Sequence, residues 1–360
     1  MEQELKKKIL SRFSEYYKSS ELDVPSVEKR EIGVGFDKKI DARHYSFETL
    51  EAFRNHLVYN TPFFVSYSAA YYEIPSATPI EKKGWQGADL IFDLDAEMKT
   101  GLKIYKELEN VKQDAIRLVE EFIVPDFGLS KKNIVYVFSG NRGYHIHIRD
   151  KEVFGLGAQE RREIVDYIRG VGLDYRKFFY EGERAGQIYG PKSDSWGYKG
   201  RFVRKMLKTL GENPSSIYRG FKKEDVKKNF LKGIDDGNWS RSPVKDIVQR
   251  MGKIASEIPL YSVNADAAVT YDVKKLIRVP NSIHGSTGLI AKKIDRIEKF
   301  DPLKDALAFE KEKVNIEGIH EVQDFEFGGE SVELKKGEKK EVGESLGLFL
   351  TLKGAANLVF

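Results

Sequence analysis

The chain has 360 residues, 41% hydrophobic and 12% aromatic, which is enough to bury at least one large core and excludes a disordered protein. It has no cysteine, which excludes disulfides, thiolate zinc sites and a cysteine nucleophile, and its net charge of +4 is too small to indicate nucleic-acid binding by itself. No apolar run is long enough to span a membrane and the N-terminus lacks a signal-peptide pattern, so we expect a cytoplasmic protein without a membrane partner.

Hydrophobic periodicity predicts alternating helices and strands in the first 150 residues. We expect an amphipathic helix over residues 1–20, a strand over 31–36, a helix over 46–59, and strands over 62–74 and 87–97. A long helix is predicted over residues 98–122, ending before Pro125, and a strand, loop and strand over 133–149.

The rest of the chain changes character twice. Residues 158–258 read as helical with a Gly/Ser/Lys-rich break at 191–200, residues 267–272 as a strand, and the chain beyond 313 as short strand-like pieces around glycine turns. We therefore predict a mixed α+β fold. Its predicted parts are a body formed by 1–157 and 259–312, a helical region between them at 158–258, and a small C-terminal β-rich module at 320–360.

The positive charge is concentrated in residues 201–250, which contain 13 Lys and Arg against 6 Asp and Glu. Within this segment the bases alternate with apolar residues at near-helical spacing, as expected for a helix lying along a phosphate backbone. A solvated helix face explains each such run equally well.

Asp93 and Asp95 lie two residues apart in the apolar run GADLIFDLDAE. In a strand, residues i and i+2 project from the same face, so the two carboxylates converge on one point. Such a pair suits a hard divalent cation such as Mg²⁺ or Mn²⁺. A strand end that meets solvent, with one aspartate capping a turn, explains the same spacing.

Two further segments carry polar side chains suited to binding phosphate. In SGNRGYH, at residues 139–145, the glycines let backbone amides approach an anion, and hydroxyl, guanidinium and imidazole groups stand alongside. The segment YDVKKLIRVPNSIHGSTGL adds another carboxylate and more donors, followed by Lys292. Three of the six histidines, His145, His147 and His284, fall in these segments, and each has an ordinary explanation as a structural side chain, His147 above all.

Together, DLIFDLDAE, SGNRGYHIHI and D-x₅-RVPNSIHGSTGL resemble, in order, the three signature motifs of the small catalytic subunit of archaeal and eukaryotic DNA primases. The preceding PFFVSYSAAYYEIP also resembles that family, so the resemblance covers about residues 1–310. It implies the archaeo-eukaryotic primase fold, a mixed α/β domain with an inserted helical subdomain, unlike that of bacterial primases.

The resemblance also implies an activity, which is template-directed synthesis of short primers during DNA replication by two-metal nucleotidyl transfer to a 3′-hydroxyl. Asp93, Asp95 and Asp272 are the implied catalytic, metal-binding carboxylates, with Mg²⁺ or Mn²⁺ as cofactor. The residues implied to hold the nucleoside triphosphate are Ser139, Arg142, His145, Arg278, His284 and Lys292. Single-stranded DNA template, nucleoside triphosphates and a large regulatory subunit forming a heterodimer are the implied partners.

The sequence departs from the family in two places. Family members often carry a zinc knuckle after the Asp pair, but this region has no cysteine, so zinc is not expected. Asn141 stands where some relatives have a second arginine, which removes one phosphate ligand. The tail is similar to the small β-rich domain of GINS replication proteins, which implies docking to other replisome proteins, and we expect catalysis not to need it.

Two other functions compete with the primase. One is a zinc- or manganese-dependent hydrolase that uses His145, His147 and His284 with an aspartate, because His-x-His is itself a metal-ligand spacing. The other is a replication scaffold that binds nucleic acid without turning over nucleotide. Only the primase explains all three motifs at once.

Overall fold

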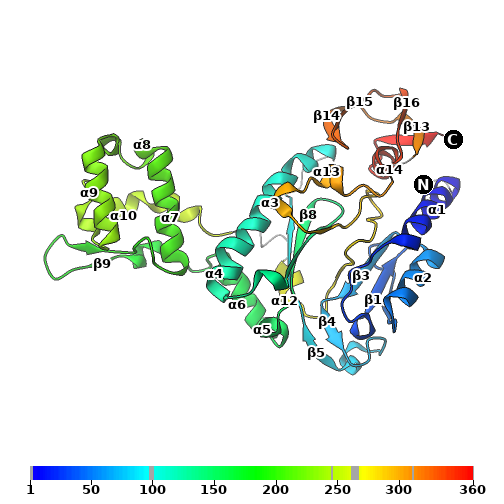
Figure 1. The fold of residues 1–360 in the computed structure, drawn as a ribbon, viewed down its shortest axis with the longest axis horizontal. Helices are drawn as coiled ribbons and strands as arrows, with labels where there is room; N and C mark the ends of the chain where they lie inside the picture. The colour runs from blue at the N-terminus through cyan, green and yellow to red at the C-terminus, as the bar shows by residue number, and fades with distance from the viewer. Residues whose placement is uncertain (1–2, 97–100, 245, 261–266, 310–311, 360) are drawn as a thin grey trace. The chain divides into compact units, whose positions relative to one another are not determined.

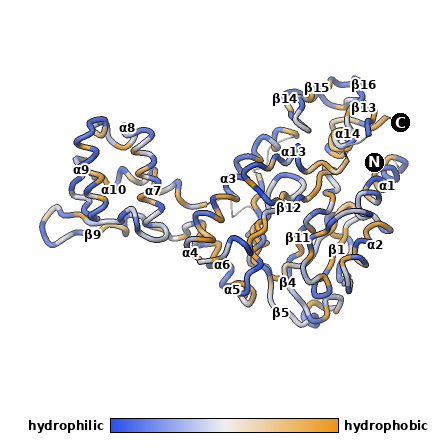
Figure 2. Tube along the Cα trace, in the orientation of Figure 1, coloured by the Kyte–Doolittle hydropathy of each residue, from blue (hydrophilic) through white to orange (hydrophobic). Residues whose placement is uncertain are grey.

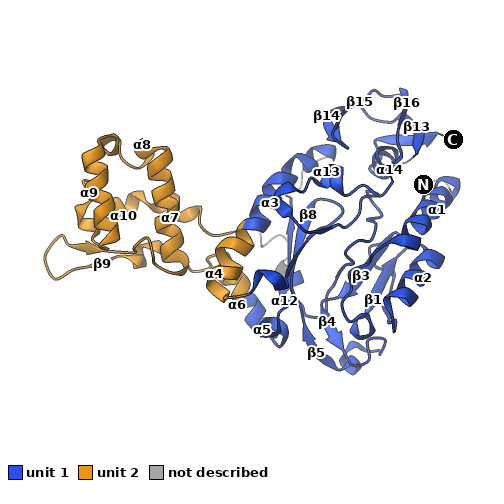
Figure 3. Cartoon of the chain, in the orientation of Figure 1, with its two compact units in different colours: residues 1–116, 130–163, 262–360 blue, residues 117–129, 164–261 orange. Residues whose placement is uncertain are grey.

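The computed structural model describes residues 3–96, 101–244, 246–260, 267–309 and 312–359. These residues form helices and antiparallel sheets, which confirms the predicted mixed α+β class. The chain divides into two compact units (Figure 3): unit 1 comprises Met1–Ile116, Ser130–Glu163 and Ser262–Phe360, and unit 2 comprises Arg117–Leu129 and Ile164–Tyr261. Nowhere in the described ranges is a helix both long and apolar enough to cross a membrane.

The first sheet of unit 1 has the strand order β11-β3-β1-β2 and is antiparallel throughout. Its strands are β1 Ile32–Gly35, β2 Ala42–Tyr45, β3 Phe64–Ser68 and β11 Leu276–Arg278. Helices α1 (Gln3–Ser19) and α2 (Leu50–Asn60) contact each other beside this sheet (Figure 1). Phe13 of α1, Phe53 of α2 and Val65 of β3 are fully buried in one shared core, so apolar burial fixes both helices to the sheet.

The second sheet has the order β12-β7-β8-β6 and is also antiparallel. Its strands are β6 Leu90–Asp95, β7 Ile134–Phe138, β8 Gly143–Ile148 and β12 Lys293–Ile294, and a separate pair is formed by β4 Ala70–Tyr72 and β5 Trp85–Ala88. Strands β7 and β8 confirm the predicted strand, loop and strand. Every residue of β8 is buried, because this strand lies between two others.

Two element predictions were wrong. Residues 267–272 were predicted as a strand, but Ala267–Tyr271 form helix α12, which packs against β6. A short apolar run does not distinguish a buried strand from a buried helix, and the two alanines that begin it favour helix.

The helical region after β6 was predicted to end before Pro125 and instead continues to Phe127. It consists of a 3₁₀-helix Gly101–Glu107, α3 Leu108–Arg117, a π-helix Leu118–Ile123 and α4 Val124–Phe127. Pro125 is tolerated because it lies in the first turn of α4, where its missing N–H does not break an established helix. The predicted start of this helix, residues 98–100, lies outside the described residues.

The C-terminal segment belongs to unit 1. Its elements are β13 Lys313–Gly318, β14 Val322–Phe327, β15 Glu330–Leu334, β16 Lys339–Gly343, α14 Glu344–Leu352 and β17 Ala356–Val359, preceded by α13 Pro302–Asp305. Arg12 of α1 donates to both carboxylate oxygens of Glu344 (2.5 and 2.8 Å), and Leu348 enters the same core as Phe13. The segment predicted as a module from residue 320 therefore shares the core of unit 1, while its likeness to GINS proteins stays a prediction.

Unit 2 is built around Trp239, which is fully buried. Phe179, Phe202 and Phe230 surround it, with ring centroids 5.0, 6.0 and 5.8 Å away. The elements of this unit, with the flanking α5 and α6, are α5 Lys151–Phe154, α6 Ala158–Ile168, β9 Tyr180–Glu181, β10 Ile188–Tyr189, α7 Gly197–Glu212, α8 Pro214–Ile217, α9 Glu224–Asp235, α10 Ile247–Arg250 and α11 Gly252–Ser256. The turn after β9 is hydrophilic (Figure 2), so the apolar side chains of unit 2 lie outside this turn. The helical insertion was predicted at 158–258, whereas unit 2 spans 164–261 and also takes in 117–129.

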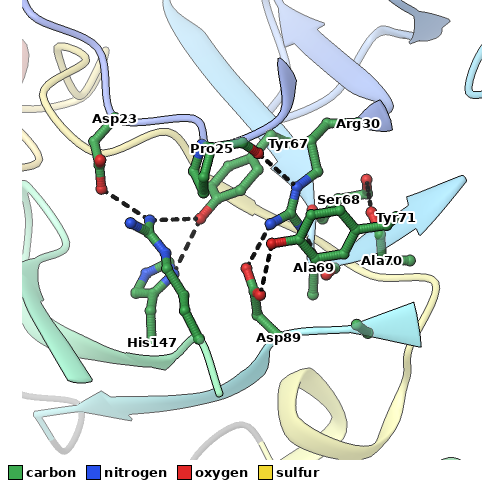
Figure 4. A network of polar contacts seen from close by, with 12 residues as sticks. Asp23, Pro25, Arg30, Tyr67, Ser68, Ala69, Ala70, Tyr71, Asp89 and His147 are labelled. Atoms are coloured by element: carbon green, nitrogen blue, oxygen red, sulfur yellow. Dashed lines mark hydrogen bonds and ion pairs between the residues drawn. The ribbon is translucent and has the colours of Figure 1, made fainter. Parts of the chain in front are cut away.

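A buried polar network joins the two sheets of unit 1 (Figure 4). The fully buried Arg30 donates to Asp89 Oδ2 (2.6 Å) and to the carbonyl oxygens of Ser68 and Ala69 (2.9 and 2.6 Å). Asp89 also accepts from the Tyr71 hydroxyl (3.0 Å). Because a buried ion pair holds only when its remaining polar atoms are satisfied, this network fixes the start of β6, the strand that carries Asp93 and Asp95.

Candidate active site

The two aspartates of β6 lie opposite strand β8 and the loop before it. In the antiparallel register Asp93 faces His145 and Asp95 faces Gly143. The His145 Nε2 is 3.5 Å from Asp93 Oδ1, and Arg142 donates to Asp95 Oδ2 through Nε and a terminal nitrogen, both at 2.9 Å. Both carboxylates are partly exposed although their strand neighbours are buried. The site is therefore a pair of acids matched to nearby bases at a sheet edge open to solvent.

The loop from Ser139 to Arg142 is held by its own side chain and by two glycines. Ser139 Oγ accepts from the backbone N–H groups of Asn141 (3.4 Å) and Gly143 (3.2 Å). Gly140 has φ +78°, and a Cβ there would lie 2.8 Å from the Cβ of His284. The third predicted segment thus packs directly on this loop, and only glycine permits that approach.

His284 is buried where these two segments meet. Its Nδ1 accepts from the Ser286 N–H (3.2 Å), while the Thr287 hydroxyl donates to the Gly140 carbonyl oxygen (2.6 Å). Burial lowers the pKa of His284 well below its usual range, and the positive charges of Arg278 and Lys353 lower it further. At neutral pH the imidazole is therefore an uncharged hydrogen-bonding group.

Arg278, on β11, brings a buried positive charge to the aspartates. Burial lowers its pKa to about 10, while the charges of Asp93 and Asp95 act to raise it. Its Nη1 has no hydrogen-bond partner among the described residues. An arginine that is desolvated and keeps an unused donor is suited to binding an anion such as phosphate.

His145 is buried on β8, and burial lowers its pKa to about 3, with Arg278 and Lys39 adding to the effect. Its Nδ1 has no hydrogen-bond partner among the described residues. His147, also on β8, is fully buried and its Nδ1 lies 3.1 Å from the Tyr67 hydroxyl. It supports the sheet contact drawn in Figure 4.

The remaining predicted residues make fewer contacts with this group. Asp272 directly follows α12, is exposed, and accepts from the Lys274 N–H (3.0 Å). The carbonyl oxygen of Lys292 accepts from the Phe138 N–H (2.8 Å), which places its backbone beside β7. Across the described residues, no three His, Asp or Glu side chains are grouped so as to hold a metal ion.

The donor set nevertheless suits a divalent cation in part. Asp93 and Asp95 offer hard carboxylate oxygens on one strand face, the ligands that Mg²⁺ and Mn²⁺ prefer. Asp272 follows a helix that packs against the same strand, so the fold provides a third carboxylate near β6 without closing a three-ligand group. The assignment of these residues as metal ligands stays a prediction.

Two residues that contact the loop were not predicted from the sequence. Lys353, at the end of α14, donates from Nζ to Asn141 Oδ1 (2.9 Å), and the Tyr105 hydroxyl donates to the same oxygen (2.9 Å). Lys353 follows an apolar run and belongs to no motif, so no sequence signal could have linked it to residue 141.

Comparison with known proteins agrees with this geometry. A family model described as DNA primase small subunit matches residues 92–296, a range that contains every predicted site residue. Proteins named DNA primase small subunit PriS from Methanothrix thermoacetophila and Archaeoglobus fulgidus are 34% and 35% identical to this chain. The alignments cover 99% of this chain and all of the first relative, and 96% of both chains for the second. A PriS from Thermoplasma volcanium is 34% identical over 86% of this chain and 83% of its own. Because the likeness spans almost the whole length and includes the three segments that meet at β6, the chain belongs to the DNA primase small subunit family.

Proposed function

We propose that the chain is the catalytic subunit of a DNA primase, a nucleotidyltransferase that synthesises short primers on a single-stranded DNA template. The observation that carries the proposal is the juxtaposition of Asp93 and Asp95 with Arg142, His145 and Arg278 in a chain of this family. An acidic pair beside two arginines and an uncharged histidine suits a reaction in which a triphosphate must be bound and negative charge develops on phosphorus.

In this reaction the 3′-oxygen of the primer bonds to the α-phosphorus, the α–β phosphoanhydride bond breaks, and pyrophosphate leaves. Asp93, Asp95 and Asp272 would hold Mg²⁺ or Mn²⁺, which when bound lowers the pKa of the attacking hydroxyl and offsets phosphate charge. In the free chain Arg142 already holds the Asp95 carboxylate, and the uncharged His145 has its Nε2 3.5 Å from Asp93 Oδ1.

The other site residues position the triphosphate. Arg278 offers an unused N–H from a buried guanidinium, and Arg142 offers a second guanidinium from the loop. Ser139 holds the loop closed by accepting from the backbone N–H groups of Asn141 and Gly143. His284 and His145, both uncharged, bind by hydrogen bonds, and Lys292 supplies a further cation from beside β7.

Partners follow from the family name and from the surface. The relatives are named small subunits, and we propose a large regulatory subunit as partner of this chain. Part of the basic segment at 201–250 lies on α7 of unit 2, where Arg204 is exposed. We propose that this surface contacts the phosphate backbone of the template or primer.

A template-directed extension assay tests the proposal. The intact chain is incubated with oligo(dT) template and labelled ATP or labelled GTP, with Mg²⁺ or Mn²⁺. We expect a ladder of products from ATP and none from GTP, because incorporation follows base pairing. Release of phosphate without polymer would replace the primase with a hydrolase, and template binding without either product would leave a scaffold.

A further inference from the structure

The end of helix α14 carries a lysine to the nucleotide loop. Lys353 Nζ donates to Asn141 Oδ1 (2.9 Å) and lies 5.2 Å from the centre of the Tyr105 ring. The family match ends at residue 296, so Lys353 lies outside the region in which the motifs were found. The contact thus comes from a part of the chain to which no site residue had been assigned.

Lys353 has no carboxylate partner within the described residues, and the charged group acting on it is the positive Arg142. Burial and, to a smaller extent, the charge of Arg142 together lower its pKa to about 8. Lys353 in turn acts to lower the pKa of His284. Asp324, the acid across the adjoining cavity, is already paired with Lys106. Arg142 is paired with Asp95, whereas Lys353 has no ion pair among the described residues, so this corner can accept a ligand with negative charge.

The helix that delivers Lys353 is firmly placed. Its first turn is tied to α1 by the ion pair between Arg12 and Glu344. Phe349 packs against the Tyr105 ring with centroids 5.1 Å apart. The side chain of Leu352 approaches Gly288, where an added Cβ would lie 3.5 Å from its Cδ1. Since α14 is held on three sides, the position of Lys353 is set by packing and not by its own hydrogen bond.

There is also space beside Lys353. It lines a cavity of about 650 Å³ together with Lys103, Lys106 and His320 and with the acids Glu321 and Asp324, all from unit 1. Cavities of this size accommodate small-molecule ligands. Asp324 is paired with Lys106, so Lys103 and Lys353 face Glu321 as the one other acid among the described residues of this wall. The chemistry that fits is a multiply charged phosphate chain.

We propose that Lys353 binds the phosphate chain of the nucleoside triphosphate, so that the C-terminal segment completes the nucleotide site. The inference rests on the proposed function, since it assigns a further residue to the same site. It also gives Asn141 a role, because its side-chain oxygen holds the ammonium group at the loop where the sequence lacks a second arginine.

Variants of the intact chain test this inference. Lys353→Met keeps the aliphatic stem over Tyr105 and removes the charge, Lys353→Arg keeps the charge, and Lys336→Met, at an exposed lysine in the turn after β15, is the matched control. Calorimetric titration with ATP, ADP and AMP in the presence of Mg²⁺ measures binding, and primer extension separates KM from kcat. We expect Lys353→Met to weaken ATP binding about tenfold, ADP binding less and AMP binding hardly at all.

The outcomes separate the inference from the proposed function. A raised KM for nucleotide in Lys353→Met, largely restored in Lys353→Arg and absent in Lys336→Met, supports the inference. A wild-type chain that extends primers while Lys353→Met, with an unchanged melting temperature, binds ATP normally would overturn the inference alone. Loss of affinity for DNA in place of ATP would also overturn it. A wild-type chain that neither binds ATP nor extends a primer would remove both.

Discussion

Units 1 and 2 use positive charge in opposite ways. The site of unit 1 holds Arg278 and Lys353 in partly or fully desolvated positions, neither of them hydrogen-bonded to an acid among the described residues, and the pKa of each is lowered mainly by burial. The cations of unit 2 are mostly at the surface or paired, as Lys205 is with Glu257 (3.0 Å) and Arg241 with Asp236 (3.0 Å). The basic segment was the more visible signal in the sequence. Burial of a basic side chain, not local net charge, is therefore the feature on which the proposed anion site rests.

Helix α7 of unit 2 has one buried basic side chain, and this side chain is paired with an acid. Arg201 is only 4% exposed, yet it donates to Asp126 (2.6 Å) and to the Glu121 carbonyl oxygen (2.6 Å). Its guanidinium carbon also lies 4.1 Å from the centroid of the Phe122 ring, a cation–π contact. Arg201 is therefore neutralised by an acid of its own unit. Each arginine keeps one N–H without a hydrogen-bond partner among the described residues, Nε in Arg201 and Nη1 in Arg278, so the ion pair is what distinguishes them.

The largest expected effect is at the acids of β6. Asp93→Asn and Asp95→Asn should each lower nucleotide incorporation by at least about a hundredfold, because each removes charge from the centre of the reaction while keeping the shape of the side chain. Asp272→Asn should do the same if Asp272 is the third ligand. Asp225→Asn, an exposed acid on α9 of unit 2, is the control and should keep full activity. Near wild-type synthesis in any of the three would remove that residue from the site.

The next effect contrasts two arginines. Arg278→Met should lose about 2 kcal/mol of transition-state stabilisation, roughly thirtyfold in kcat/KM, because a charged donor leaves the phosphate site. Its melting temperature should not fall, since a buried guanidinium whose pKa is lowered costs stability in the free chain. Arg204→Met in unit 2 should change neither quantity much. A large loss of stability in Arg278→Met with unaltered KM for nucleotide would make Arg278 a structural residue like Arg201.

A smaller effect is expected for the surface of unit 2. The double variant Arg204→Ala/Lys208→Ala should reduce affinity for single-stranded DNA a few-fold and flatten its dependence on salt concentration, because fewer phosphates are neutralised. Incorporation at saturating template should remain. Anisotropy titrations of labelled oligo(dT) at several salt concentrations measure both the affinity and its dependence on salt. An unchanged salt slope would show that α7 takes no part in template binding.

The smallest effect is a pH dependence of stability. Because the pKa of Lys353 is about 8 in the folded chain and near 10.5 when unfolded, the unfolded chain binds more protons between these values. Stability should therefore rise with pH from about 8 to 10.5 through this residue. Three titratable groups that face Lys353 keep their charge state in this pH range. Arg142 stays charged, His284 is already neutral, and burial raises the pKa of Tyr105 above the range. Across this pH range the melting temperature of wild type should rise relative to that of Lys353→Met. If the two melting temperatures depended on pH in the same way, Lys353 would be fully solvated.

Much of the site could be predicted because its parts are local in sequence. The alternation around Asp93 and Asp95 predicted a strand, and the strand, loop and strand at 133–149 followed from β-branched and aromatic residues around a glycine turn. The glycines and donors of SGNRGYH indicated a phosphate loop before any contact was known. Family membership, also predicted from these motifs, is confirmed by relatives at 34% and 35% identity.

Long-range packing decided the rest. Whether 267–272 formed a strand or a helix depended on its contact with β6, which a short apolar run does not encode. The C-terminal tail had an alternating pattern typical of an independent module, yet Leu348 packs into the main core. Lys353 contacts Asn141, which lies 212 positions earlier in the chain. Sequence patterns record the period and chemistry of each segment. The desolvated positions of Arg278 and Lys353 arise only when segments remote in the chain close around them.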